Sequence, residues 1–160
     1  MTTIVHASTD GAARGNPGPA GAGVLITDSK GKKLKEVSLY LGEATNNVAE
    51  YSALICALSE AARLGAKQVK IQTDSELVAR QISGEYRIKD THLRVLHSLA
   101  KQLMGGFKQV TLHRIPREKN LKADKLANRA VDDGLRLKGS TNKKPSKAPH
   151  PSQGSFRFVS

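Results

Sequence analysis

The sequence predicts an α/β domain in which helices flank a five-stranded mixed sheet, followed by a basic tail. Two observations carry this prediction. Three strand-like segments with alternating apolar residues come first, at residues 3–10, 21–28 and 33–41. Helical patterns then alternate with two short apolar strands, 67–73 and 108–115. An antiparallel meander followed by strand–helix alternation favours a mixed sheet with helices packed on it.

Four segments have helical periodicity. The first runs from Asn47 to Leu64 and stops at Gly65, a residue suited to the end of a helix. Shorter helices are expected over 75–82 and 91–104. A last amphipathic helix begins near residue 121, and its apolar face is outlined by Leu121, Ala123, Leu126, Ala127, Ala130 and Val131.

Charge divides the chain into a domain over residues 1–135 and a basic tail over 136–160. The net charge is +12, and none of the 14 acidic residues lies after Asp133, whereas six of the 26 basic residues do. Residues 139–154 are rich in Ser, Pro, Lys and Gly, which is typical of a linker or a disordered segment. Alternation of aromatic and polar residues in 155–159 leaves open a second arrangement, docking as an edge strand.

Composition narrows the class of protein. Apolar residues make up 38% and charged residues 25% of the chain, and no apolar run has the length of a membrane span. The start MTTIVHAS lacks a secretory pattern, so we expect a cytoplasmic protein without a membrane partner. The single cysteine, Cys56, cannot form an internal disulfide. The positive charge favours a polyanion, nucleic acid first, although a merely solvated surface is the alternative.

Two acidic residues in the first half of the domain stand in unusual contexts. Asp10 comes directly before a long stretch of Gly, Ala and Pro, and Asp-Gly on its own is ordinary turn chemistry. Glu50 heads the apolar stripe of the first helix, where a carboxylate needs a partner. The alternative for Glu50 is a capping box that begins at Asn47.

Two further acids follow in the second half. Asp74 lies where a strand gives way to a helix and can be interpreted as an N-cap, and Asp124 near the start of the last helix can be interpreted as a dipole-stabilising acid. If strand 67–73 lies parallel beside the first strand, Asp10 and Asp74 emerge at neighbouring carboxyl ends. Four converging carboxylates would repel one another unless cations sit among them. Two Mg²⁺ ions about 3.5–4 Å apart suit such a cluster and support phosphodiester cleavage.

Four stretches carry a resemblance to a known family. In order and spacing, TDGAARGNPGPAGAG, TNNVAEYSALICAL, IQTDSELV and IPREKNLKADKLANRA resemble ribonuclease H of type 1, in an archaeal-like or short bacterial form that lacks the basic protrusion. The match covers nearly all of residues 3–133. It implies a ribonuclease H-like fold and hydrolysis of the RNA strand of RNA/DNA hybrids with two Mg²⁺ ions, or Mn²⁺ as substitute. The products would carry 5′-phosphate and 3′-hydroxyl ends.

The resemblance also implies roles for single residues. Asp10 would bridge both metals, Glu50 and Asp74 would complete one site, and Asp124 would hold the ion that activates the attacking water. Backbone at residues 11–15 would approach the nucleic acid. The implied substrate contacts are Gly11, Asn16, Asn46, Asn47 and Arg117. We expect a monomer. A protein of the same fold that binds RNA/DNA hybrid or double-stranded RNA without cleaving it is the alternative, and an integrase-like or resolvase-like nuclease is a third.

Three departures from the family pattern affect substrate contacts rather than the acids. The loop RIPREKN lacks the His that many bacterial members carry. Arg117 in this loop either replaces that His or, as we expect, only contacts phosphate. The basic protrusion of some members is missing between residues 82 and 91. Glu76 and Val48 stand where a Gln and an Arg are common.

Overall fold

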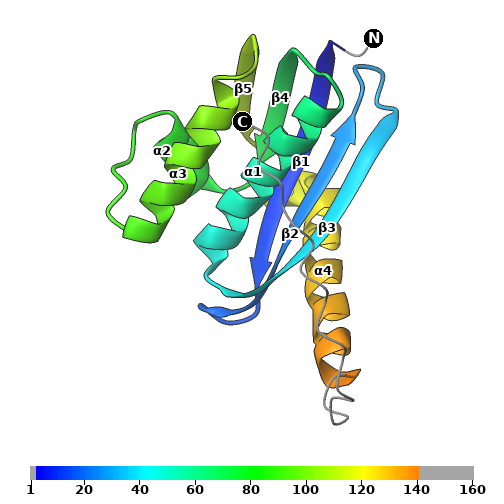
Figure 1. Ribbon diagram of the computed structural model, residues 1–160, viewed down its shortest axis with the longest axis vertical. Coiled ribbons are helices and arrows are strands. Elements are labelled where there is room, and N and C mark those ends of the chain that lie inside the picture. Colours follow the sequence, from blue (N-terminus) through cyan, green and yellow to red (C-terminus); the bar gives the residue numbers. More distant parts are fainter. Residues whose placement is uncertain (1–2, 141–160) are drawn as a thin grey trace, which may run out of the picture.

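A computed structural model describes residues 3–140 and contains the predicted mixed sheet, with five strands in the order β3-β2-β1-β4-β5. The first three form an antiparallel meander, and the last two join parallel to β1 and to each other (Figure 1). Their bounds are β1 Ile4–Ala13, β2 Gly18–Thr27, β3 Lys33–Ala44, β4 Gln68–Thr73 and β5 Gln109–Arg114.

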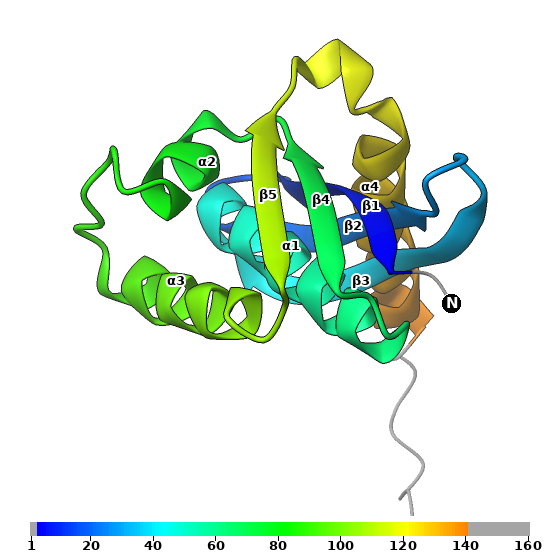
Figure 2. The same cartoon turned by 90° about the horizontal axis from the view of Figure 1, so that it is seen from above.

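Helices cover both faces of the sheet. Figures 1 and 2 show α1 and α3 on one face and α4 on the other, where α4 lies across β1, β2 and β3. The helices are α1 Asn46–Arg63, α2 Glu76–Ile82, α3 Thr91–Met104 and α4 Leu121–Ser140, with a 3-10 turn η1 at Arg117–Lys119. Among the described residues, 3–140, no helix combines the length and the apolarity needed to cross a membrane.

Strand β2 has two different faces because its residues alternate in direction. Val24 and Ile26 belong to the buried core on the α1 side, which also holds Leu54. On the α4 side the strand has glycines: a Cβ atom at Gly23 would lie 2.3 Å from the Ala123 carbonyl oxygen. The helix backbone therefore lies directly on the strand. The small residues that follow Asp10 in the sequence serve close packing here.

The first strand is longer than predicted, which corrects the interpretation of Asp10 as a turn residue. Pairing between β1 and β2 continues to Ala13, and Asp10 itself pairs with Gly23 in mid-strand. A Cβ atom at Gly11 would lie 2.3 Å from the backbone nitrogen of Glu50. The missing side chain at Gly11 thus makes room for α1. The approach of nucleic acid to the backbone of residues 11–15 stays a prediction.

The last helix continues to Ser140, past residue 135 where the change in charge suggested a boundary. The division into a domain and a tail stays a prediction. Docking of 155–159 as an edge strand concerns residues outside the described range.

Candidate metal centre and catalytic pocket

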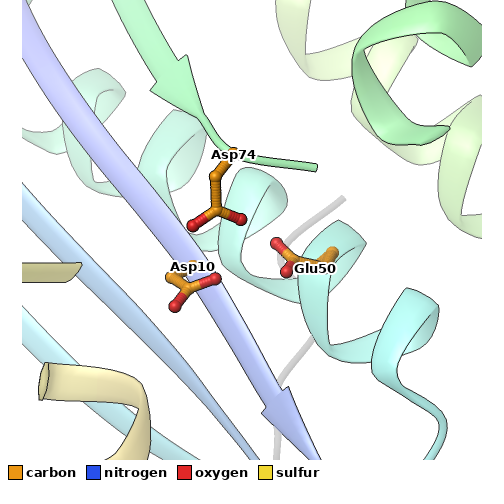
Figure 3. Close-up of side chains that lie close together, drawn as sticks. All are labelled: Asp10, Glu50 and Asp74. Atoms are coloured by element: carbon orange, nitrogen blue, oxygen red, sulfur yellow. The ribbon is translucent and has the colours of Figure 1, made fainter. Parts of the chain in front are cut away.

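Three acids converge at the carboxyl ends of two parallel strands. Strands β1 and β4 pair in parallel up to Thr9 and Thr73, so the next residues, Asp10 and Asp74, leave the ladder side by side. Glu50 reaches the same point from the N-terminal part of α1. Figure 3 shows the three carboxylates pointing toward one another from three separate elements. The conditional sequence prediction about parallel pairing is therefore confirmed.

The cluster has the geometry of a cation site. One carboxylate oxygen each from Asp10, Glu50 and Asp74 lie within 4.8 Å of one another. Asp10 is 4% and Glu50 5% exposed, and the buried Oε2 of Glu50 has no hydrogen-bond partner among residues 3–140. A buried anion without a partner is costly. The donor set, carboxylate oxygens only, suits a hard divalent cation such as Mg²⁺, and the orphaned oxygen shows that these residues fit one.

Electrostatics supports the same conclusion. Burial, followed by the charge of Asp74, raises the pKa of Asp10 to about 7. Burial, followed by the charges of Asp10 and Asp74, also raises the pKa of Glu50 above its ordinary value. Both shifts mean that the ionised cluster is disfavoured in the metal-free protein. A bound cation would remove this penalty because it replaces repulsion by attraction.

The fourth acid, Asp124, approaches the cluster from the first turn of α4. It lines the same pocket of 560 Å³ as the other three, and a hydrogen bond with Asp124 contributes to the raised pKa of Asp10. Its Oδ1 accepts a hydrogen bond from Asn128 Nδ2 at 3.2 Å, and Arg117 Nη2 lies 4.0 Å from the same atom. The structure thus brings all four predicted acids to one pocket.

The alternative explanations for two of the acids are wrong. Helix α1 is capped by Thr45, whose Oγ1 accepts from the Val48 N–H at 3.2 Å, so Glu50 does not belong to a capping box. Helix α2 is capped in the same way by Ser75. Asp74, one residue earlier, is not the cap. Because neighbouring hydroxyls satisfy the helix ends, both carboxylates can face the pocket.

Sequence reasoning missed Asn120, whose side chain is hydrogen-bonded to one acid of the cluster, Asp74. This side chain is 2% exposed, and its Nδ2 donates to the Thr9 carbonyl at 2.8 Å and to Asp74 Oδ2 at 3.3 Å. It therefore joins the loop before α4 to β1 and orients the Asp74 carboxylate. Its position directly before a helix is the only sequence signal, and Asn is so common there that the signal points to a cap.

The predicted substrate residues divide into two groups. Gly11, Asn46 and Arg117 line the pocket, and the Arg117 side chain is 81% exposed. Asn16 and Asn47 are not among the lining residues. Asn16 instead accepts, through Oδ1, a hydrogen bond from the Asn46 N–H at 3.1 Å. The pocket has three further polar lining residues that the sequence did not single out, namely Arg14, Ser75 and Asn128.

Known proteins share this sequence and architecture. The family model described as "Reverse transcriptase-like" matches residues 8–130. The chain is 43% identical over 129 residues to "Ribonuclease HI" of Halobacterium salinarum. This match covers 81% of the present chain but only 65% of the Halobacterium protein. It is 36% identical to "Ribonuclease H" of Methylococcus capsulatus, with 82% of this chain and 91% of that protein covered.

A solved structure of a ribonuclease H is also similar to this chain. LC11-RNase H1, crystallised in complex with RNA/DNA hybrid, superposes with a TM-score of 0.78 at 46% identity and covers 82% of this chain and 99% of that one. The family match over residues 8–130 includes all four acids. The five-stranded architecture, the carboxylate cluster and these matches agree, and the chain belongs to the ribonuclease H type 1 family.

Proposed function

We propose that this protein is an endonuclease that hydrolyses the RNA strand of RNA/DNA hybrids with two Mg²⁺ ions, or Mn²⁺ in their place. The observation that supports this most directly is the cluster of Asp10, Glu50 and Asp74, each of which offers one carboxylate oxygen within 4.8 Å of the others. A protein that only bound nucleic acid would gain nothing from carboxylates facing its phosphates, because like charges repel.

Each acid has a proposed role. Asp10 would bridge both ions, Glu50 and Asp74 would complete one site, and Asp124 would hold the second ion together with Asp10. When bound, divalent ions generate the nucleophile from water and stabilise the charge on attacking and leaving oxygens. The chain itself fixes the carboxylates on β1, on α1, directly after β4 and on α4, and Asn120 donates a hydrogen bond to the Asp74 carboxylate. Hydrolysis would leave 5′-phosphate and 3′-hydroxyl ends.

The substrate would lie over the pocket mouth. Arg117 is exposed at its edge, which supports a contact with phosphate. Asn46, held by Asn16, presents a polar group at the N-terminus of α1, where phosphate is favoured by the helix dipole. Gly11 and Asn47 complete the proposed contacts. RNA would be distinguished from DNA by its 2′-hydroxyl groups in the shallow minor groove.

We propose that the protein acts as a monomer in the cytoplasm. Its four acids all come from one chain, so the site needs no second copy.

A cleavage assay with strand-specific labels tests the function. The labelled RNA of an RNA/DNA hybrid should be cut in Mg²⁺ or Mn²⁺ and remain intact with a chelator, while double-stranded RNA, double-stranded DNA and free RNA remain intact. Asp10→Asn should abolish turnover and leave hybrid binding largely intact, because the change removes a charge without changing the shape of the side chain. Binding without cleavage by the unaltered protein would favour the non-cleaving alternative, and full activity of Asp10→Asn would refute the role of Asp10.

A further inference from the structure

A second hollow adjoins the catalytic pocket, and most of its charged lining residues are basic. This basic groove has a volume of 850 Å³ and lies between α4 and the β2–β3 hairpin. Its charged lining residues are Lys33, Glu36, Lys122, Lys125, Arg129 and Asp132. None of the four acids described above lines it, so it is separate from the metal centre.

The groove and the catalytic pocket meet on α4. Asn128 lines both of them. Arg14 of the pocket also pairs with Asp132 of the groove at 2.6 Å, and its Nη2 donates to the Asn128 carbonyl at 3.4 Å. A ligand that fills the pocket can therefore continue across α4 at Asn128 without leaving the surface.

The charge of the groove is complementary to phosphate. Its two acids are already neutralised, Glu36 by Lys33 at 3.1 Å and Asp132 by Arg14. Lys122 and Lys125 are exposed, and neither has an ion-pair partner among residues 3–140. Arg129 is 3.9 Å from Asp133, which lies outside the groove. The acid-lined pocket suits the phosphate that is cleaved, because that group needs metal ions. The unpaired lysines beside the pocket suit the neighbouring phosphates of the same polyanion, because those groups need positive counter-charges.

We infer that the basic groove binds the phosphate backbone of the nucleic-acid strand that continues from the catalytic pocket, with Lys122 and Lys125 as the main contacts. This inference rests on the proposed function. It predicts that Lys122 and Lys125 do not increase the affinity for hybrids that are too short to reach past Asn128.

The test compares two matched double variants in the inactive Asp10→Asn background. Lys122→Gln with Lys125→Gln removes two charges from the groove. Lys67→Gln with Lys108→Gln removes two exposed charges directly before β4 and β5, at the ends of these strands that lie away from the catalytic pocket. There the Lys108 N–H donates to the Lys67 carbonyl at 2.9 Å. Binding of labelled RNA/DNA hybrids of about 6 and about 20 base pairs is measured by fluorescence anisotropy over a salt series in Mg²⁺.

Each lost phosphate contact lowers the slope of log affinity against log salt by about 1. The groove variant should therefore bind the long hybrid with a slope shallower by about 2, and it should bind the short hybrid like the parent. The control variant should change the slope of neither hybrid by more than a few tenths. Equal slopes for the two double variants, or an equal effect on both hybrid lengths, would overturn the inference. If the unaltered protein neither binds nor cleaves the hybrid, the proposed function itself fails.

Discussion

Replacing Asn120 by Ala tests whether the buried amide positions the metal centre. The change removes two hydrogen bonds, one to the neutral Thr9 carbonyl at 2.8 Å and one to the Asp74 carboxylate at 3.3 Å. A neutral bond contributes about 0.5–1.5 kcal/mol and a bond to a charged group about 1.5–3 kcal/mol. We expect the free energy of unfolding to fall by about 2–4.5 kcal/mol.

Loss of stability alone would not demonstrate positioning, so the assay must also report on the site. Without its donor the Asp74 carboxylate is no longer held toward Asp10 and Glu50. Loss of a group that orients a metal ligand typically weakens metal affinity by about 10–100-fold. Calorimetric titration with Mn²⁺ in the absence of nucleic acid measures this affinity directly, and urea denaturation of the metal-free protein measures stability.

Gln81→Ala is the matched control. Gln81 is also a buried amide, 5% exposed, and its Oε1 accepts from the Tyr51 hydroxyl at 2.6 Å on the α1 side of the molecule. It does not line the catalytic pocket. Its truncation should lower stability by about 1–3 kcal/mol, because the buried Tyr51 hydroxyl loses its partner, and should leave Mn²⁺ affinity within about twofold of the parent. If Asn120→Ala loses stability but keeps parental Mn²⁺ affinity, the positioning argument is refuted.

Two further predictions follow from packing and titration. Gly11→Ala should destabilise the fold by about 1–3 kcal/mol or more in urea denaturation, because the added methyl would lie 2.3 Å from the Glu50 backbone nitrogen; a loss below 0.5 kcal/mol, roughly the scatter between surface variants, would contradict the packing argument. Because the folded pKa of Asp10, about 7, lies above its ordinary value, the folded metal-free protein binds more protons than the unfolded chain between about pH 4 and pH 7. This contribution to stability is present at low pH and is lost as the pH rises through 7. Asp10→Asn should therefore be stabilised relative to the parent by more at pH 8 than at pH 5 in thermal denaturation, and Mg²⁺ should raise the melting temperature of the parent more at pH 8, where the ligands are deprotonated. A difference between the two proteins that does not change with pH would contradict the assignment.

Much of the site could be predicted because its acids stand in unusual local contexts in the sequence. Asp74 follows an apolar strand and Asp10 comes directly before a stretch of small residues, and parallel pairing of the two strands was the condition under which these two acids would meet. Glu50 was recognisable because a carboxylate at the head of an apolar stripe needs a reason to be there. These signals are local, and the structure brings the three carboxylates together as expected.

Helix caps and small residues were harder to interpret, because one residue type serves several purposes. Thr45, Asn47, Asp74 and Ser75 are all chemically able to cap a helix, and only the backbone path selects Thr45 and Ser75. Gly11 fits both a turn and a close contact between elements. In the structure Gly11 serves the close contact, because α1 lies against β1 at this residue.

The sequence by itself determined the order of the elements, the mixed character of the sheet and the four acids that meet at one pocket. Only the tertiary structure decided that Asn120 joins Thr9 to Asp74, across 111 residues of chain, and that a basic groove continues from the pocket over α4. The physical reason is range. Periodicity and strand ends are set by neighbours along the chain, whereas buried hydrogen bonds and the lining of a groove depend on which helices pack on which face of the sheet.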